Sequence, residues 1–353
     1  MTTIASFSNA RVVVLGGTGA QGRSVFISKT DGGLALANGS NFQVSVLTRD
    51  ISSSSCRALQ AEFPAVKLLQ GSYTTEAGLR TAFADQDVVY FNIDSFSVGE
   101  PFEYFWTFRA YEIAVQSKIK WFIYSGAGSV DRFVAHGLAE EYRNSHNIVA
   151  ARLAGWLAAQ PLDRLPWSII TGGVYAEMLN RLLKPVPQGD GYVFKLPLNK
   201  ESIMPLIPLD NYGEAVKWAL EHPRESLGKF VSAGPFQLTL DQVADALEQY
   251  TGKKTKFQPI TLADWMERIS ANIDPEGRLP RGASPDDTTA FTFRKSFGAW
   301  WSIWRDNRIP ETKDDSQQWA EVPRLSKYKT LREWMVDVEY NPAHFSTSFK
   351  GKQ

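Results

Sequence analysis

The sequence predicts an α/β protein: a Rossmann-type parallel sheet with helices on both faces, followed by a smaller, aromatic-rich C-terminal α+β domain. Between residues 11 and 173, short apolar runs alternate with amphipathic stretches, and this repeated strand–helix–strand order indicates a parallel sheet with right-handed crossovers. After residue 173 the alternation weakens. We therefore expect residues 1–173 to form the Rossmann domain, with 200–234 returning to it, and residues 174–345 to form mainly a substrate or interaction domain.

The expected strands of the first domain are apolar runs, several of them continuous, as is typical of strands covered on both faces. They are Arg11–Gly17, Gln43–Arg49, Val66–Gly71, Asp87–Ile93, Trp121–Ser125 and Trp167–Thr171. The expected helices between them are Gln21–Lys29, Ser54–Phe63, Glu76–Phe83, Phe102–Ser117 and Leu138–Ala159. Residues 31–41, rich in glycine and asparagine, are expected to form a surface loop.

The second half of the chain has fewer regular signals. Helices are expected at Asp210–Leu220, with Asp210 as the N-cap, at Thr239–Tyr250, with Thr239 as the N-cap, and at Phe293–Arg305. A strand is expected at Gly228–Ala233, a polar loop at 274–287 and a frayed tail at 345–353.

Composition argues against several classes of function. The chain has 38 basic and 38 acidic side chains, so it does not resemble a generally cationic protein that binds nucleic acid or a membrane surface. No stretch approaches the ~20 apolar residues of a membrane helix. The four histidines are scattered, so we expect no metal site. The single cysteine, Cys56, and the absence of a secretory signal favour a cytoplasmic location, or a nuclear one for a regulator.

A glycine-rich loop follows the first expected strand. In VVVLGGTGAQG, the glycines Gly16, Gly19 and Gly22 have the spacing G-x-x-G-x-x-G. Gly16 permits the tight turn, Gly19 lets backbone approach a pyrophosphate, and Gly22 lets the helix pack close to the sheet. Between a strand and a helix, this pattern predicts a dinucleotide held by Gly16, Thr18, Gly19, Ala20, Gln21 and Gly22. The alternative is a tight turn that binds nothing.

Arg49 favours NADP(H) over NAD(H). NAD-selective Rossmann domains usually carry an acidic residue at the end of the second strand, whereas this strand ends in Thr48, Arg49 and Asp50. A guanidinium can clamp a 2′-phosphate. If Asp50 points inward instead, the preference weakens or reverses, so NAD(H) stays open, as does a merely solvated Arg49.

Other strand ends are expected to complete the crevice, because ligands of open α/β sheets lie beyond the carboxyl ends of the strands. The residues predicted there are Asn92, Ile93 and Ser125 for the cofactor and Tyr175 for a substrate.

Several motifs together resemble the NmrA-like family, a group of atypical short-chain dehydrogenase/reductases. They are GGTGAQG, TRD at 48–50, FIYSG at 122–126 and PLDNYGEAV at 208–216; FRKSFGAWWSIW and TLREWM at 330–335 resemble the fungal-type branch. The resemblance implies a Rossmann domain with a small C-terminal substrate domain. Its members include NADP-dependent reductases and isomerases of small metabolites, and catalytically silent redox sensors that bind transcription factors.

The chain departs from the family pattern at one position. Family reductases carry a lysine in an H-x-x-x-K pattern on the helix after the fifth strand, and the resemblance places Ala150 there, four residues after His146. Ala150 cannot donate a proton. Tyr142 and His146 would share a face of one helix and could relay protons, or they could be an ordinary surface pair. Ser125, Tyr124 and Tyr175 are further candidate donors.

An aromatic stripe marks the C-terminal half. It consists of Phe293, Phe297, Trp300, Trp301 and Trp304, at the spacing of one helix face. The stripe either packs against the Rossmann domain or contributes rings to an apolar substrate pocket. For the pocket we expect Trp301, with Tyr175 and Met178; Phe194 and Trp265 are further candidates.

Two functions remain open, with a purely structural role as a third. The first is an NADP(H)-dependent oxidoreductase that reduces or isomerises a small apolar or aromatic metabolite without the usual lysine. The second is a catalytically silent NAD(P) redox sensor that binds a regulatory protein partner, for which the alanine at position 150 costs nothing.

Overall fold

The computed structural model describes residues 7, 9–25, 42–126, 140–271, 273–280, 283–306, 320–321 and 327–344. Its centre is a seven-stranded sheet in the order β11-β6-β5-β4-β1-β2-β3, in which every pairing is parallel. The strands are β1 (Arg11–Leu15), β2 (Gln43–Thr48), β3 (Lys67–Gln70), β4 (Val88–Phe91), β5 (Trp121–Gly126), β6 (Trp167–Thr171) and β11 (Phe230–Ser232). The α/β class and all six strands predicted in the first half are therefore confirmed.

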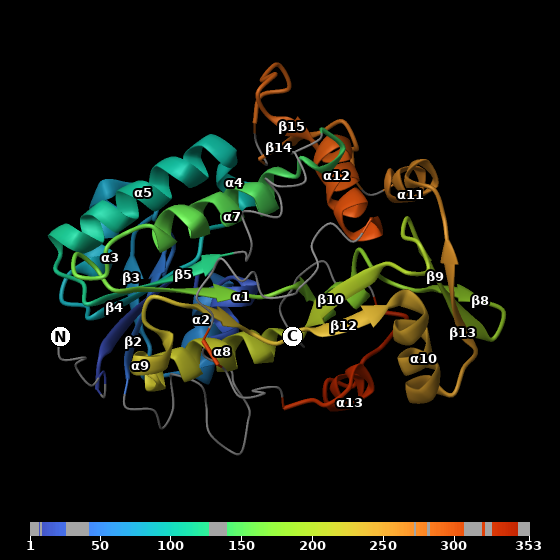
Figure 1. The fold of residues 1–353 in the computed structure, drawn as a ribbon, viewed down its shortest axis with the longest axis horizontal. Coiled ribbons are helices and arrows are strands. Elements are labelled where there is room, and N and C mark those ends of the chain that lie inside the picture. The colour runs from blue at the N-terminus through green and yellow to red at the C-terminus, as the bar shows by residue number, and fades with distance from the viewer. Residues whose placement is uncertain are drawn as a thin grey trace.

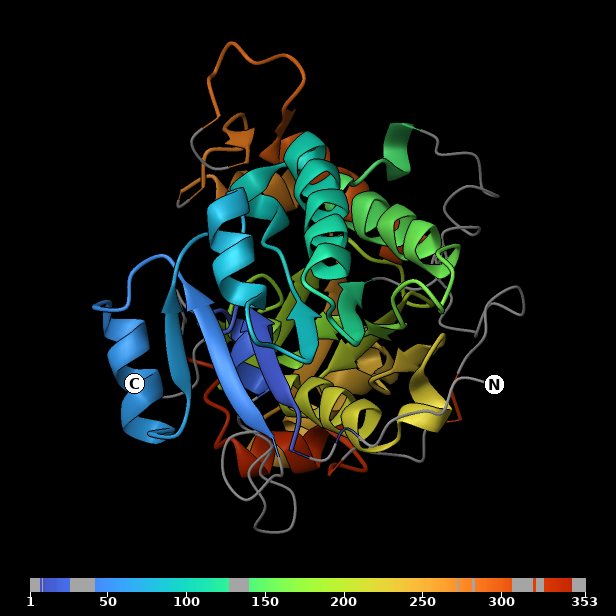
Figure 2. The ribbon, with the colours of Figure 1, turned by 90° about the vertical axis from the view of Figure 1, so that its left-hand side faces the viewer.

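Helices cover both faces of this sheet (Figures 1 and 2). Strand β1 shows why: Val12 and Val14 face one apolar core, and Val13 and Leu15 face another. The first core packs on α2 (Ser54–Glu62) and α8 (Leu209–Glu221), and the second on α3 (Glu76–Phe83), α5 (Glu100–Gln116) and α7 (Ser145–Ala158). The short helices α1 (Ala20–Ser24), α4 (Ser95–Val98) and α9 (Pro223–Ser226) complete this domain. Continuous apolar strands are what such two-sided burial requires.

The C-terminal part has smaller sheets around an aromatic core. One is β12-β10-β7 and another is β13-β9-β8, and β14 pairs with β15 in a hairpin. The strands are β7 (Val174–Tyr175), β8 (Val186–Gln188), β9 (Gly191–Leu196), β10 (Ile203–Ile207), β12 (Phe236–Thr239), β13 (Thr255–Pro259), β14 (Arg278–Leu279) and β15 (Phe291–Thr292). The helices are η3 (Ala176–Asn180), α10 (Leu240–Thr251), α11 (Leu262–Ile269), α12 (Phe293–Arg305) and α13 (Leu331–Asp337). In Figure 1 these elements lie to one side of the large sheet.

Several predicted details are wrong. The expected helix 138–159 is interrupted: η2 (Glu140–Tyr142) is separate, and α7 begins only at Ser145 because the Asn144 side chain caps it. Asp210 is not an N-cap; α8 begins at Leu209, whose N–H donates to Glu177 Oε1. The loop expected at 274–287 includes β14.

Other predicted details are confirmed or untested. Thr239 caps α10 in a capping box with Gln242. The loop expected at 31–41, the tail at 345–353 and the end of the first predicted helix lie outside the described residues.

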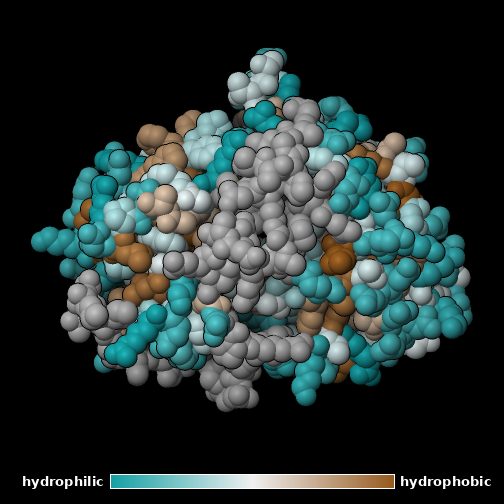
Figure 3. Space-filling model, in the orientation of Figure 1, coloured by the Kyte–Doolittle hydropathy of each residue, from teal (hydrophilic) through white to brown (hydrophobic). Residues whose placement is uncertain are grey.

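The visible surface is mostly hydrophilic. On the face drawn in Figure 3, hydrophobic side chains of the described residues form small, separate patches. None of the described helices is long and apolar enough to cross a membrane.

Gly213 lets α8 lie directly against α1, the helix that follows the glycine-rich loop. A Cβ at this position would lie 2.0 Å from the Ser24 carbonyl oxygen, which is backbone and cannot move aside cheaply. The close approach of the two helices therefore depends on the absence of a side chain.

We expect Gly213→Ala to lower the free energy of unfolding by about 2–4 kcal/mol, because it forces α1 and α8 apart. The matched control is Gly298→Ala in α12, where the new Cβ meets the end of the Leu262 side chain at 3.3 Å. The control should stay within about 1 kcal/mol of the wild type, since better helix propensity offsets the tight contact. Urea unfolding followed by circular dichroism measures both; equal effects would contradict the argument.

Candidate functional site

The glycine-rich loop between β1 and α1 is a tight turn against the end of β4. Gly16 has φ +73°, and a Cβ there would lie 2.9 Å from the carbonyl oxygen of Asn92. The Gly19 N–H donates to the Gly16 carbonyl at 2.9 Å. A Cβ on Gly22 would lie 2.2 Å from the same carbonyl. Gly16 and Gly22 are therefore required by local geometry, and the exposed Gly19 leaves the outer side of the turn open.

Ser125 connects this loop to two other elements. Its hydroxyl donates to Gln21 Oε1 at 2.9 Å and accepts from the Tyr212 hydroxyl of α8, also at 2.9 Å. Burial raises the pKa of Tyr212 to about 12, so its hydroxyl keeps its proton. The Ser125 proton is thus already engaged, and the geometry makes Ser125 a support for the loop helix at the end of β5.

Arg49 and Asp50 follow β2 and differ in their contacts. Asp50 Oδ1 accepts from the backbone N–H and the hydroxyl of Ser52, at 2.8 and 2.6 Å. These bonds lower the pKa of Asp50 and keep its carboxylate in the turn before α2. Arg49 is exposed and makes no hydrogen bond or ion pair with the described residues. Its guanidinium remains available for an anion.

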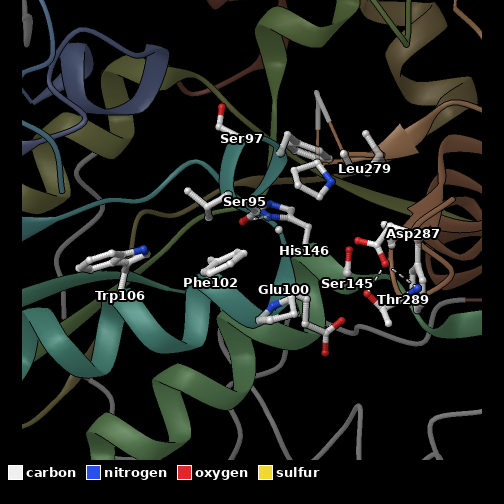
Figure 4. Close-up of a pocket in the computed structure, with 18 of the residues that line it drawn as sticks. Ser95, Ser97, Glu100, Phe102, Trp106, Ser145, His146, Leu279, Asp287 and Thr289 are labelled. Atoms are coloured by element: carbon white, nitrogen blue, oxygen red, sulfur yellow. Dashed lines mark hydrogen bonds between the residues drawn. The ribbon is translucent and has the colours of Figure 1, made fainter. Parts of the chain in front are cut away.

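A cavity of about 480 Å³ lies beyond the carboxyl end of β4. Its lining comes from the β3–α3 turn, α4 and the start of α5, the first turn of α7, and the hairpin region of β14 and β15. The lining residues are Thr74, 95–102, Trp106, Ser145, His146, Leu279, Pro280, Ala283, Asp287 and 289–291. In Figure 4, Ser95 and His146 lie next to each other, with Phe102 and Trp106 on one side and Asp287 and Thr289 on the other.

His146 lies in the first turn of α7 and is held from two sides. Its Nδ1 is 2.8 Å from Ser95 Oγ, and its ring packs on Phe96 with centroids 5.2 Å apart. Asn144, the cap of this helix, donates through Nδ2 to the Ser296 carbonyl of α12 at 2.8 Å. Burial lowers the pKa of His146 despite the opposing charge of Asp94, so its imidazole is neutral near neutral pH.

Glu103 is a functional candidate that the sequence did not indicate. It lies in the first turn of α5 with 2% of its surface exposed, and its Oε2 has no hydrogen-bond partner among the described residues. Burial, with smaller contributions from the charges of Asp94 and Glu100, raises the pKa of Glu103 to about 8, although a hydrogen bond with Ser95 lowers it. The carboxyl group is therefore protonated at neutral pH. A glutamate at a helix start is normally a charged surface residue, so the pattern gave no signal.

Tyr142 does not pair with His146, so the proton relay considered for these two residues is not formed. Since α7 begins at Ser145, the two side chains do not share a helix face, and the Tyr142 hydroxyl donates to Asp306 Oδ2 at 3.0 Å. Tyr142 thus belongs to the contact with the end of α12. Ala150, where the resemblance implies lysine, is buried one turn after His146.

The residues predicted for the substrate pocket do not line this cavity. Trp301 is 1% exposed and packs edge-on against Trp265, with centroids 5.1 Å apart, because the aromatic stripe fills the C-terminal core. Met178 packs on the same core, and Tyr175 packs on a core of the large sheet. Of the stripe, Phe297 approaches the cavity by stacking on Phe96, with centroids 6.0 Å apart.

No group of three or more histidine, cysteine or acidic side chains in the described part of the chain could hold a metal ion.

We expect the stability of the protein to depend on the charge of Glu103. Its folded pKa of about 8 lies above the ordinary 4.5, so the folded state binds a proton that the unfolded chain releases. Stability therefore falls as pH rises between these values, by up to about 1.4 kcal/mol per pH unit. Glu103→Gln should flatten this fall, so that the loss between about pH 6 and about pH 8 shrinks by about 1–3 kcal/mol in urea unfolding.

Glu100→Gln is the control, since it removes a carboxylate from the same helix turn at a less buried position. Glu100→Gln should leave most of the fall in the free energy of unfolding with rising pH in place. A wild-type slope in Glu103→Gln would show that this carboxyl does not bind the extra proton.

Known proteins with similar sequences and folds can now be compared. The NmrA-like family profile matches residues 8–335. The NmrA-like family domain-containing oxidoreductase ptmS of Penicillium ochrochloron is 26% identical over 269 residues, 72% of this chain and 76% of the relative.

Solved structures share the fold at low identity. The pinoresinol-lariciresinol and phenylcoumaran benzylic ether reductases give a TM-score of 0.65 at 15% identity, over 92% of this chain and 98% of theirs. NmrA, a negative transcriptional regulator, gives a TM-score of 0.62 at 15% identity, over 85% of this chain and 84% of that one. NmrA in complex with NADP gives a TM-score of 0.55, and NmrA in complex with NAD gives a TM-score of 0.56. Both are 18% identical over 85% of this chain and 94% of theirs. With a family profile that spans most of its length, the chain belongs to the NmrA-like family.

Proposed function

We propose that the protein is an NADP(H)-dependent oxidoreductase that reduces or isomerises a small apolar or aromatic metabolite. The observation that carries this proposal is the cavity of about 480 Å³, whose lining segment from Ser95 begins three residues after Asn92, the residue against which the glycine-rich loop turns. A loop that fits a dinucleotide and a cavity that fits a small molecule thus share one strand end, the usual place for ligands in such sheets.

The loop fits a pyrophosphate because its outer side is bare backbone at Gly19, with no side chain to cover it. Structures of NmrA with NAD and with NADP support a nicotinamide dinucleotide as the ligand. Thr18, Ala20 and Gln21 would border the phosphates, and Asn92, Ile93 and the Ser125 region would border the nicotinamide half. When bound, the reduced cofactor supplies a hydride. This chain's own residues then have to orient the substrate and provide a proton.

The cavity suits an apolar substrate with few polar groups. Phe96, Phe102, Trp106 and Phe291 provide aromatic surface, and His146 and Ser95 lie next to each other near the centre (Figure 4). The other polar lining residues are Thr74, Ser97, Glu100, Ser145, Asp287 and Thr289. This composition fits a planar or aromatic carbonyl or enone held by its rings and polarised at one oxygen. The Penicillium relative, named as an oxidoreductase, supports both this activity and the fungal-type branch.

A redox sensor is the second candidate function, and Ala150 favours it. The family's regulator NmrA shares the fold, and a sensor needs cofactor affinity without a lysine. The two functions separate in one set of assays with purified protein and NADPH. Oxidation of NADPH by a panel of enones, quinones and aryl ketones supports the enzyme. Tight NADPH binding without turnover on any of them supports the sensor.

We expect Arg49→Ala to weaken NADP more than NAD. A charge-assisted contact to the 2′-phosphate contributes about 1.5–3 kcal/mol, which corresponds to a tenfold to hundredfold loss for NADP. Isothermal titration calorimetry with both nucleotides measures the ratio. Arg80→Ala is the control, because Arg80 of α3 pairs with Glu76 of the same helix and with Gln116 of α5, and it should leave both affinities unchanged. Equal losses for the two nucleotides in Arg49→Ala would rule out the 2′-phosphate contact.

A further inference from the structure

We propose that Glu103, Ser95 and His146 form a proton relay that runs from beneath the cavity into it and replaces the lysine absent at position 150. The inference rests on the proposed function for its role in catalysis, but the relay itself is a property of these three side chains.

The geometry places the three groups in sequence. Glu103 is 2% exposed, its carboxyl interacts with the Ser95 hydroxyl, which lowers the pKa of the carboxyl, and Ser95 Oγ lies 2.8 Å from Nδ1 of His146. Ser95 and His146 line the cavity, and Glu103 does not. In an imidazole ring, Nε2 lies on the opposite edge from Nδ1. A proton can therefore enter this chain from a carboxyl that does not line the cavity and leave at Nε2 of a ring that does.

The chain starts from three neutral groups. The raised pKa of Glu103, about 8, keeps its carboxyl protonated at neutral pH, and the lowered pKa of His146 keeps the ring neutral. The charged neighbours are Asp94, on the loop after β4, and Glu100, one turn before Glu103; both disfavour a carboxylate at 103.

Three tyrosines interact electrostatically with the same carboxyl: Tyr104 of the same helix, Tyr124 of β5 and Tyr73 of the β3–α3 turn. Burial raises the pKa of each of these phenols, so they stay neutral as well. Among the described residues that interact with the Glu103 carboxyl, we therefore expect no other group to ionise between about pH 6 and about pH 9 and be confused with Glu103.

One cycle of the relay moves one proton. His146 gives its Nε2 proton to the substrate oxygen that gains charge as the carbonyl is reduced. Nδ1 takes the Ser95 hydroxyl proton, and Ser95 takes the proton of Glu103, which is left as a carboxylate. The ring ends neutral in its other tautomer, so no imidazolium forms in the buried site. After product release, a proton from water enters at Nε2 and the same shifts in reverse restore Glu103.

This arrangement explains why Oε2 of Glu103 can remain unpaired. A buried carboxylate without a cation would be costly, but a protonated carboxyl is neutral and its proton has the Ser95 hydroxyl as an acceptor. The group becomes charged only when the proton has moved to the substrate.

The test follows the His146 ring by two-dimensional NMR as pH is raised from about 6 to about 10. Its signals are assigned by their loss in His146→Gln. In the wild type the chemical shifts of these signals should change in one step near pH 8, because Glu103 deprotonates at the other end of the proton relay. The step should vanish in Glu103→Gln and shrink in Ser95→Ala. Glu177→Gln is the matched control, since Glu177 is a buried glutamate whose pKa is also raised to about 8, and the step should persist.

A ring that shows no step in the wild type, or the same step in Glu103→Gln, overturns the relay whatever the protein catalyses. Failure of the proposed function is a different result: the step is present, but NADPH does not bind or is not oxidised. Where a substrate is turned over, Glu103→Gln should lower kcat by about 100-fold and abolish the decline in rate above about pH 8, with the NADPH dissociation constant unchanged.

Discussion

The site depends on two places where backbone lies against backbone. Gly22 brings α1 onto the turn at Gly16, and Gly213 brings α8 onto α1 at Ser24. The loop helix is thus clamped between the sheet and α8, and the Tyr212–Ser125–Gln21 hydrogen bonds fix its rotation from the end of β5. Any side chain at either glycine would move the loop away from the ends of β4 and β5, and with it everything that the loop can bind.

The C-terminal part completes the site without adding the aromatic rings that its composition suggested. Most of the aromatic stripe packs in a core within the C-terminal part. Three contacts connect this part to the sheet domain. The Ser296 carbonyl holds the cap of α7, Phe297 stacks on Phe96, and the β14–β15 region forms one wall of the cavity. His146 and Ser95 are therefore positioned jointly by both parts of the chain, which gives a reason for the second domain that does not require it to touch the cofactor.

How far the sequence predicted this structure depends on the range of the interactions. The strands and the glycine loop were predictable because continuous apolar runs and glycine spacing report local requirements. The sequence indicated His146 as a site residue, but the partner that it suggested, Tyr142, is wrong. The i, i+4 spacing between the two residues assumed that they lie on one helix. Asn144 is a good capping residue and could have indicated the break before Ser145. Glu103 was missed because its neighbours come partly from segments distant in sequence, such as Tyr124 of β5 and Tyr73 of the β3–α3 turn, and no periodicity records them.

Burying the Glu103 carboxyl costs free energy, and this cost bears on the choice between enzyme and sensor. A protein that only binds a dinucleotide has no use for a protonated carboxyl beneath a separate cavity. An apolar side chain of similar size would fill the same space and would leave no buried oxygen without a hydrogen-bond partner. Perturbed titratable groups next to cavities are concentrated at sites that do chemistry, where such a cost is offset by function. Ala150 removes one proton donor one turn away from His146, whereas the relay that we propose would supply another from Glu103 through Ser95. The absence of the lysine therefore no longer weighs toward a silent protein, and the cavity, the neutral imidazole and the buried acid favour an enzyme.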